Sequence, residues 1–307
     1  MIKKNKLGFG TCQLGGVNKI GNRHVGMGSQ RKKDSIDALN LAYKSGIIFY
    51  DTADIYGNGK SEKLLGEVFK KNKNVIICSK IGNEIKEKSV IFNFSKNYVL
   101  KKLKSMLTRL NRKTLDILLV HSPPSDFTLT DDTIMLIKDL KKRGLIKNFG
   151  ISFSTIEHAK KILKLSKISK NIDYIEVIYN ILDRRAEEIF KITKKFKIKI
   201  IARMPYANGF LIRKNFNFKK NDFRNNVDAK FILWIKKYQN KLLKLNLPIS
   251  EIALRFFYNN DNIKYVIPGM RNKNQVLQNV KSYKKGKLNK NYHEIIKKFP
   301  MSFYKWN

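Results

Sequence analysis

The stretch FYDTADIYGNGKSEKLLG, residues 49–66, places two carboxylates and a phenol directly after an apolar run. Asp51 and Asp54 follow the segment IIFY, and Tyr56 precedes a short glycine loop. Unpaired carboxylates near an apolar core cost free energy, so stability alone does not explain them. Carboxyl and phenol groups can transfer protons, and we therefore interpret this stretch as part of a functional site.

Further polar residues close the apolar runs that come later in the chain. In order, the polar residues at the ends of these runs are Asp51, Lys80, His121, Ser152, Glu176 and Arg203. Their spacings of 29, 41, 31, 24 and 27 residues fit the length of one strand plus one helix. In a barrel of parallel strands all the carboxyl ends face one mouth, so these residues would converge there.

Eight short apolar segments, rich in β-branched and aromatic residues, are predicted to be strands. They cover residues 6–11, 47–51, 74–80, 115–121, 146–152, 173–179, 197–203 and 263–269. Helical periodicity follows most of them, as in residues 34–46, where Asp34 is a candidate N-cap and Gly46 a stop. Strands that alternate with helices indicate a parallel sheet.

An open, doubly wound sheet fits this alternation as well as a barrel does. The polar residues at the strand ends decide between them, because a barrel brings all of these residues to one mouth. We therefore predict an α/β fold, a (β/α)₈ TIM barrel, as a single domain over residues 1–307. Residues from about 285 to 307 would form its C-terminal tail.

The glycine-rich segments do not match the common phosphate-binding motifs. A Walker A loop ending at Gly59 needs a glycine where Asp54 stands. The dinucleotide fingerprint G-x-G-x-x-G is broken by Gln13 in one segment and by Arg31 in another. Neither a P-loop enzyme nor a Rossmann dehydrogenase is supported.

The chain resembles the aldo-keto reductase superfamily along nearly its full length. Residues 49–66 are similar to that family's D-T-A-x-x-Y-G segment, VIICSKIG to its lysine strand and LDILLVHSP to its histidine strand. The segments IKNFGIS, IEVIYNILDRR, IARMPYANGFL and YVIPGMRNKNQVLQNV follow in family order. The resemblance implies a (β/α)₈ barrel that holds NADPH without a Rossmann fold and reduces carbonyl compounds to alcohols.

The same resemblance makes Asp51, Tyr56, Lys80 and His121 the catalytic residues. Tyr56 would protonate the alkoxide formed during reduction, but a phenol with its usual pKa of about 10 is a reluctant donor at neutral pH. A neighbouring ammonium from Lys80, anchored by Asp51, is expected to lower that pKa. His121 would add a second hydrogen bond to the carbonyl oxygen.

Taken one at a time, these residues also have structural interpretations. Asp51 and Asp54 can cap loops. Tyr56 can pack half-buried, and His121 can be a satisfied core residue. Lys80 fits a structural role less well, because an ammonium after the run VIICS must meet an anion or reach the mouth. The joint occurrence of these residues after consecutive strands favours the functional interpretation.

The resemblance also assigns residues to the nicotinamide end of the cofactor. Gly10 and Thr11 would approach it through backbone atoms, and Ser152 and Glu176 would hold its carboxamide. Two positions depart from the family pattern, since Phe153 stands where Asn is usual and Glu176 where Gln is usual. An ionised Glu accepts hydrogen bonds but cannot donate, so we expect the cofactor to bind with altered geometry.

Arg203 occupies the place where a Tyr often stacks beneath the nicotinamide, and its charge is expected to favour the reduced cofactor. The adenosine end is assigned to Gly269, Arg271, Gln275 and Asn279. Arg271 is the expected ligand of a 2′-phosphate, and its alternative interpretation is a solvated arginine at a helix start. We predict NADPH as cofactor, with NADH as the less favoured alternative.

The charge balance raises a second possibility. The chain has 64 Lys and Arg against 24 Asp and Glu, a net charge of +40, which is typical of proteins that bind nucleic acid. The lysines are spread along the chain without a nucleic-acid motif, so solvated surfaces are the preferred explanation and nucleic acid is not predicted as a partner. A basic nucleic-acid-binding protein and a non-catalytic NADPH-binding or sensor protein are the alternatives to a reductase.

The remaining composition predicts a protein without metal or membrane segments. Cys12 and Cys78 lack metal-ligand spacing with the four histidines, and no apolar run reaches the roughly 18 residues of a membrane span. We predict a cytoplasmic enzyme for a small carbonyl compound, polar or anionic in character. The walls of the substrate site would come from residues 15–32, 208–226 and 299–307, where basic and aromatic residues are mixed. The sequence does not predict an oligomeric state.

Overall fold

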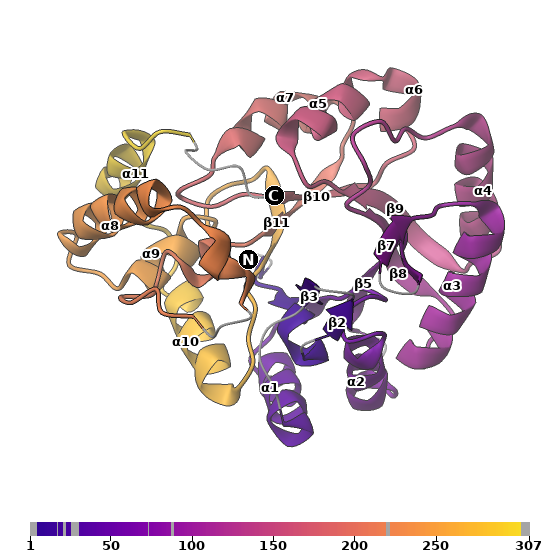
Figure 1. The fold of residues 1–307 in the computed structure, drawn as a ribbon, viewed down its shortest axis with the longest axis horizontal. Coiled ribbons are helices and arrows are strands. Elements are labelled where there is room, and N and C mark those ends of the chain that lie inside the picture. Colours follow the sequence, from indigo (N-terminus) through magenta and orange to yellow (C-terminus); the bar gives the residue numbers. More distant parts are fainter. Residues whose placement is uncertain are drawn as a thin grey trace.

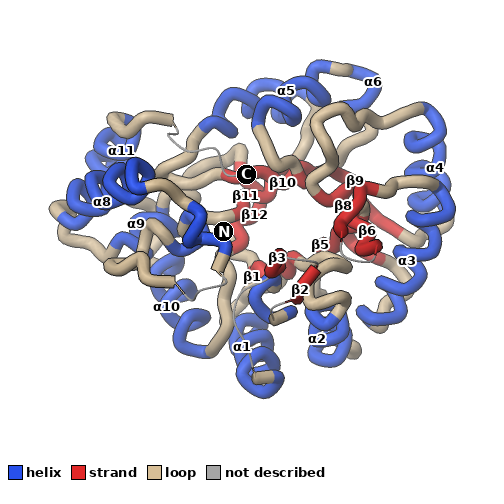
Figure 2. Tube along the Cα trace, viewed as in Figure 1, coloured by secondary structure: helices blue, strands red, loops and turns tan. Residues whose placement is uncertain are grey.

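The computed structural model describes residues 5–16, 18–20, 23–25, 31–72, 74–86, 89–218 and 222–301. Eight parallel strands form a ring, and bridges from Leu7 to Val266 and from Gly10 to Gly269 close it (Figure 2). In ring order the strands are β1 (Phe9–Gly10), β4 (Phe49–Asp51), β5 (Ile76–Ile81), β8 (Leu115–His121), β9 (Ile146–Ser152), β10 (Tyr174–Ile178), β11 (Lys199–Arg203) and β12 (Ile263–Ile267). The prediction of a (β/α)₈ barrel is confirmed.

Helices surround this ring (Figure 1). They are α1 (Lys32–Lys44), α2 (Lys60–Phe69), α3 (Lys96–Leu110), α4 (Asp131–Lys142), α5 (Ile156–Lys164), α6 (Ser166–Ser169), α7 (Phe190–Lys195), α8 (Ala229–Leu243), α9 (Ile249–Arg255), α10 (Lys273–Lys284) and α11 (Lys290–Lys297). The tail predicted from residue 285 onward contains α11, while residues 302–307 lie outside the described residues. The tail boundary stays a prediction.

The start of α1 differs from the prediction. Arg31, not Asp34, is the N-cap residue, and it has extended backbone angles. Asp34 lies in the first turn, where its carboxylate accepts hydrogen bonds from the Arg31 guanidinium at 2.8 and 3.1 Å. An acidic residue in the first turn favours the helix through the macrodipole, so Asp34 stabilises α1 without capping it.

Two antiparallel hairpins were not predicted. One pairs β2 (Asn18–Ile20) with β3 (Arg23–Val25), and the other pairs β6 (Asn83–Lys86) with β7 (Ser89–Phe92). β6 begins two residues after the end of β5, so the second hairpin is attached to the carboxyl end of that strand. It therefore lies at the end of the barrel where the strand-end polar residues gather.

The barrel interior has an apolar layer beneath a polar layer. Phe49, Cys78, Leu119, Tyr174 and Ile201 belong to one buried cluster inside the ring. Because alternate residues of a strand face the same side, the residues two positions further on also point inward. These are Asp51, Lys80, His121, Glu176 and Arg203. A two-residue period therefore places each polar side chain directly above an apolar one.

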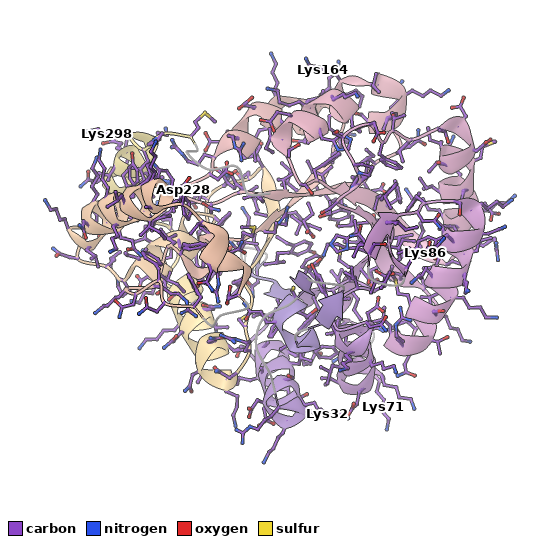
Figure 3. The ribbon with its side chains drawn as sticks, viewed as in Figure 1. Lys32, Lys71, Lys86, Lys164, Asp228 and Lys298 are labelled. Carbon is purple, nitrogen blue, oxygen red and sulfur yellow. The ribbon has the colours of Figure 1, made fainter. Side chains whose placement is uncertain are left out.

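Most of the excess positive charge lies outside this ring. Lys32, Lys71 and Lys164 are exposed and stand at the periphery of the molecule (Figure 3). Lys80 differs from these surface lysines, because its side chain is 0% exposed. Among the described helices, none has the length and apolar character needed to cross a bilayer.

Gly150 permits the close approach of β9 and β10. A Cβ atom at this position would lie 1.9 Å from the Tyr174 backbone oxygen and 2.8 Å from the Leu119 side chain. We expect Gly150→Ala to lower the free energy of unfolding by about 3 kcal/mol or more, because backbone atoms must shift. Urea denaturation would measure it.

Gly144→Ala is the matched control for this substitution. Gly144 has a φ of +68° and no atom within 4 Å of an added Cβ, so it tests backbone strain without a clash. We expect a loss of only about 1 kcal/mol there. Equal losses for the two variants would show that contact between β9 and β10 is not the constraint.

Candidate active site

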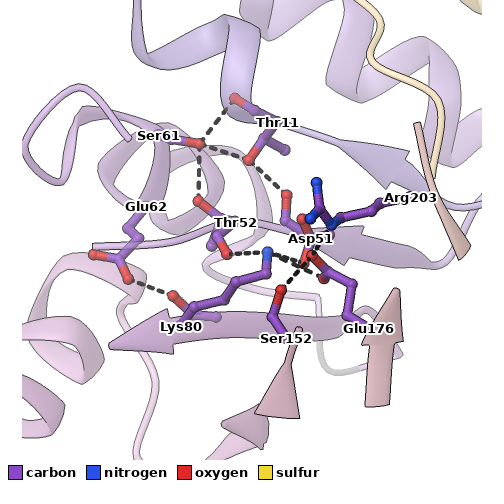
Figure 4. Close-up of polar contacts among 10 residues, drawn as sticks. Thr11, Asp51, Thr52, Ser61, Glu62, Lys80, Ser152, Glu176 and Arg203 are labelled. Carbon is purple, nitrogen blue, oxygen red and sulfur yellow. Dashed lines mark hydrogen bonds and ion pairs between the residues drawn. The ribbon is translucent and has the colours of Figure 1, made fainter. Parts of the chain in front are cut away.

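Lys80 lies at the centre of the polar layer. Its Nζ atom donates to Asp51 Oδ1 at 2.5 Å and to the Thr52 backbone oxygen at 3.1 Å, and it lies 3.3 Å from Glu176 Oε2 (Figure 4). Burial alone would lower the pKa of Lys80, but the carboxylates of Asp51 and Glu176 raise it well above its ordinary value. The side chain is therefore a fixed ammonium, as the sequence predicted for the partner of Asp51.

Asp51 is shared between backbone and side-chain partners. Its backbone oxygen accepts from the Thr11 backbone nitrogen at 2.9 Å and from Thr11 Oγ1 at 2.7 Å. Burial and the nearby Glu176 raise the pKa of the Asp51 carboxyl, while Lys80 opposes the shift. Thr11 thus stabilises the strand end that carries Asp51 rather than pointing freely into the mouth.

A chain of buried hydroxyl groups supports the loop after β4. Thr52 Oγ1 donates to Ser61 Oγ at 2.9 Å, and Ser61 Oγ donates to Thr11 Oγ1 at 2.6 Å (Figure 4). Ser61 belongs to α2, so the chain connects β1, β4 and the helix that follows them. None of these hydroxyls was identified as supporting the site from sequence, because ordinary Ser and Thr spacing gives no signal.

A tight backbone contact between two glycines positions the loop that carries Tyr56. Gly57 has a φ of +61°, and a Cβ there would lie 2.2 Å from the Gly15 backbone oxygen. Gly15 is the last residue of a 3₁₀ turn at Cys12–Gly15, so this turn packs directly against the loop that carries Tyr56. The glycine loop in the sequence is therefore explained by packing that orients Tyr56.

Tyr56, Lys80 and His121 come together at the mouth. Lys80 Nζ lies 5.4 Å from the centre of the Tyr56 ring, and the rings of Tyr56 and His121 meet edge to face with centroids 5.8 Å apart. Burial lowers the pKa of His121 well below its ordinary value, with help from Lys80 and Arg203. His121 is therefore a neutral imidazole that can donate one hydrogen bond at neutral pH.

The pKa of Tyr56 differs from the sequence-based expectation. Lys80 does act to lower it, but burial outweighs the ammonium, and the net direction is upward. Cys12, Asp51 and Glu176 add to the rise. Because the net shift is upward, Tyr56 is a protonated phenol and not a partly ionised one. The sequence showed the neighbouring cation but not how deeply the phenol is buried.

Glu176 belongs to the Lys80 cluster as well as to the predicted cofactor residues. Its Oε1 accepts from Ser152 Oγ at 3.0 Å and lies 3.9 Å from Arg203 Nε. Glu176 is thus a counter-charge close to Arg203, and the expected effect of Arg203 on the preference for the reduced cofactor stays a prediction. Arg203 also donates to the Phe153 backbone oxygen at 3.3 Å.

The polar atoms around Glu176 fit a nicotinamide carboxamide. Within the described part of the chain, Glu176 Oε2 and Arg203 Nε are buried without a hydrogen-bond partner. A primary amide has an acceptor oxygen and two N–H donors, so a guanidinium donor beside a carboxylate acceptor complements it. With a nicotinamide bound, Arg203 would supply the donor that the Gln-to-Glu departure removes, and this role stays a prediction.

Two strand ends at the mouth have left-handed backbone. Ser122 follows His121 with a φ of +47°, and Met204 follows Arg203 with a φ of +57°. Such conformations cost free energy in non-glycine residues and are concentrated at functional sites. Asn180 shapes another turn here, since its side chain accepts from the backbone of Leu182 and donates to the Met204 oxygen.

Cys12 was missed as a neighbour of the site. Burial raises the pKa of its thiol to about 11, and the charges that act on it are those of Lys80, Asp51, Glu176 and Arg203. The thiol is therefore protonated and lies among the polar residues of the mouth. A single cysteine without a motif gave no signal of this in the sequence.

The residues predicted for the adenosine end lie around the start of α10. Gly269 meets Gly10 at the bridge that closes the barrel, and the Arg271 backbone nitrogen donates to Gln275 Oε1 at 2.8 Å. Asn279 accepts from the Tyr206 hydroxyl at 2.6 Å. Gln275 and Asn279 therefore each hold a neighbouring segment in place, and their binding roles remain predictions.

A large cavity lies elsewhere among the described residues. It measures about 1150 Å³ and is lined by residues at the amino ends of strands, including Ile76, Tyr174 and Tyr265. Lysines at 194, 197, 199 and 264 also line it. The cavity thus lies at the end of the barrel opposite the Lys80 cluster.

The described residues were also considered as possible metal ligands. No group of three or more His, Cys, Asp and Glu side chains there is arranged to hold a metal ion. The polar layer instead combines two carboxylates, an ammonium, a guanidinium, an imidazole and a phenol.

Comparisons with known proteins agree with this architecture. A model described as the aldo/keto reductase family matches residues 6–300, and the chain therefore belongs to the aldo/keto reductase family. Members of this family are oxidoreductases that use a nicotinamide cofactor, so the chain is an NAD(P)H-dependent reductase.

Individual relatives are distant but cover nearly the whole chain. The uncharacterised oxidoreductase YqkF of Bacillus subtilis is 26% identical over 287 residues, 92% of this chain and 91% of the relative. The NADH-specific methylglyoxal reductase of Escherichia coli is 24% identical and covers 91% and 90%. The holo form of aldo-keto reductase AKR11C1 from Bacillus halodurans has a TM-score of 0.78 at 26% identity, covering 98% and 94%.

Asp54 gives the loop that carries Tyr56 a pH-dependent stability. It does not cap the loop: both carboxylate oxygens are buried without a hydrogen-bond partner among the described residues, and Lys102 Nζ is 3.7 Å away. Burial raises the pKa of Asp54 to about 7. Because this pKa exceeds the unfolded value, the stability that the carboxyl contributes is complete below about pH 4 and is lost as the pH rises through about 7.

We expect Asp54→Asn to raise the free energy of unfolding at pH 8 by about 2 kcal/mol and to change it little at pH 4. Denaturant titrations at the two pH values would measure this. Asp261→Asn, at a fully exposed side chain, is the control. A gain that is the same at both pH values would show that Asp54 is not the titrating group.

Proposed function

We propose that this protein is an NADPH-dependent reductase of aldehydes or ketones in which Tyr56 is the general acid. The observation that supports it most directly is the arrangement of Tyr56 between the Lys80 ammonium and the His121 imidazole. Tyr56 and Lys80 are 24 positions apart in the sequence, and Lys80 and His121 are 41 positions apart. The ends of β5 and β8 bring them together. Packing alone does not require a phenol, an ammonium and an imidazole at one mouth.

The chemistry that a bound nicotinamide supplies is hydride transfer to the carbonyl carbon. The protein's own residues manage the charge that develops on the oxygen. Tyr56 donates its hydroxyl proton to that oxygen, and the Lys80 ammonium stabilises the phenolate that remains. Neutral His121 donates a second hydrogen bond to the same oxygen.

Asp51 positions Lys80 rather than reacting itself. Its carboxylate holds the ammonium at 2.5 Å, and the Thr52 oxygen accepts a further hydrogen bond from it. A buried ammonium without these partners would lose its proton or leave the site. Asp51 thereby keeps a positive charge beside Tyr56 through the whole cycle.

The preference for NADPH over NADH is supported by a gathering of arginines near α10. Burial lowers the pKa of Arg213, and the charges of Arg224 and Arg271 lower it further. Asp222 binds Arg224 through two side-chain hydrogen bonds, and its charge also acts on Arg213, in the direction that raises the pKa of that guanidinium. A guanidinium fork matches the oxygens of a phosphate, so a gathering of arginines suits the 2′-phosphate that NADPH alone has.

We expect a small carbonyl compound as substrate. The E. coli relative is named for reduction of methylglyoxal with NADH, which makes both the carbonyl class and the choice of dinucleotide direct experimental questions for this chain. The sequence predicts walls from residues 208–226, where Phe210, Phe216 and Phe218 pack together. The polar or anionic character of the substrate remains a prediction.

We predict that Tyr56→Phe lowers kcat for carbonyl reduction by about 10²- to 10⁴-fold, the usual value of a positioned general acid. The Kd for NADPH should stay within about twofold, because the ring and its packing remain. Cofactor consumption at 340 nm and fluorescence titration would measure the two quantities.

Tyr43→Phe is the control, because Tyr43 lies on α1 and packs against Phe69, away from the mouth. Reduction by the Tyr56 variant at the rate of the unmodified protein would show that the proton has another source.

We also predict that Arg271→Gln raises the Kd for NADPH about tenfold or more and leaves the Kd for NADH within about twofold. The reason is that NADPH alone has the additional phosphate. Arg143→Gln, at an exposed residue of a surface ion pair, should change neither. Equal losses for the two dinucleotides would place Arg271 away from the 2′-phosphate.

A further inference from the structure

Lys80 is shared by two carboxylates that belong to different parts of the barrel. Asp51 approaches from β4 and Glu176 from β10, with Lys80 Nζ at 2.5 and 3.3 Å from their oxygens. All three side chains are at most 4% exposed. Asp51 alone would satisfy an ammonium, so the second buried carboxylate needs its own explanation.

The second carboxylate also faces a second cation. Glu176 Oε1 lies 3.9 Å from Arg203 Nε, and Ser152 Oγ donates to the same oxygen (Figure 4). In the polar layer, two carboxylates and two cations therefore alternate in space, each next to the following one. They are Asp51, Lys80, Glu176 and Arg203. With a neutral amide in place of Glu176, the same layer would have one net positive charge.

That charge matters because the two forms of the cofactor differ by one charge at the nicotinamide ring. The oxidised ring is cationic and the reduced ring is neutral. An uncompensated cation beside the carboxamide would weaken binding of the oxidised ring and leave the reduced ring nearly unaffected. A carboxylate in that place removes the penalty.

We propose that Glu176 is a specificity-determining residue whose carboxylate balances Lys80 and Arg203, so that the site binds the oxidised dinucleotide as firmly as the reduced one. The inference rests on the proposed function for the position of the nicotinamide. It adds that the oxidised dinucleotide binds firmly enough for the reverse reaction, alcohol oxidation, to be measured, although the same charge disfavours the Tyr56 phenolate. In oxidation the alcohol gives its O–H proton to the Tyr56 phenolate and its C–H hydrogen, with two electrons, to the oxidised dinucleotide.

The charge of the same carboxylate also acts on Tyr56. The charged and titratable side chains that surround Tyr56 come from several elements, namely Cys12 before β2, Asp51 of β4, Lys80 of β5, His121 of β8, Glu176 of β10 and Arg203 of β11. Glu176 opposes the effect of Lys80 on the phenol. Removing its charge should therefore make Tyr56 the stronger acid.

The first test is Glu176→Gln, with the Kd of NADP⁺ and of NADPH measured by calorimetry on the full-length protein. We expect the ratio of the Kd of NADP⁺ to that of NADPH to rise about tenfold, the effect of one charge at several ångströms in a partly polar interior. Glu188→Gln, in a surface ion pair with Lys160, is the control and should leave the ratio unchanged. Arg203→Gln removes a cation instead and should lower the ratio.

The second readout is the pH profile of alcohol oxidation, which needs the Tyr56 phenolate. In Glu176→Gln the rising limb should move to lower pH by about one unit. Glu176→Asp, which keeps the charge, should restore both the profile and the Kd ratio toward those of the unmodified protein. A structural role would change the two Kd values in parallel and leave the profile in place.

The results separate this inference from the proposed function. An unchanged Kd ratio in Glu176→Gln, in protein that reduces carbonyls normally, would overturn the role of Glu176 alone. If Glu176→Gln does not fold, an unchanged ratio in Arg203→Gln would overturn it as well. A shifted ratio in a protein that turns over no carbonyl would leave the role of Glu176 standing and remove the proposed reaction. No binding of either dinucleotide would remove both.

Discussion

A buried ammonium is the constraint around which the mouth of this barrel is built. Lys80 is 0% exposed and cannot be solvated, so its charge must be met by anions and carbonyl oxygens. Asp51 and Glu176 both meet it, and the Thr52 oxygen completes the set (Figure 4). Because Asp51 ends β4, Lys80 lies in β5 and Glu176 lies in β10, the two ion pairs depend on the closure of the whole ring.

The two-residue period of the strands explains how an apolar core and a charged site occupy one interior. Phe49 and Asp51 share an inward face, as do Cys78 and Lys80. The apolar member fills the barrel and excludes water, which strengthens every electrostatic interaction in the layer above it. The same exclusion keeps His121 neutral and Tyr56 protonated, so burial sets the acid and base states of the site.

Sequence alone predicted the strands, the order of the polar residues and their meeting at one end, because apolar periodicity and strand direction determine these features. The two hairpins were missed, since short polar segments such as Asn83–Lys86 have no apolar period. The contact of Glu176 with Lys80 and Arg203 was missed too, because it crosses the barrel and depends on side-chain reach. The raised pKa of Tyr56 required knowledge of burial depth that a cation at a strand end does not give.

We place the chemistry at the carboxyl ends of the strands, over Lys80, and not in the cavity of about 1150 Å³ at the opposite end. A crystal structure of the protein with NADPH and an unreactive carbonyl analogue tests it most directly. We expect the carbonyl oxygen to lie within hydrogen-bond distance of the Tyr56 hydroxyl and of a ring nitrogen of His121. An analogue and cofactor seated between Ile76 and Tyr174 at the other end would contradict it.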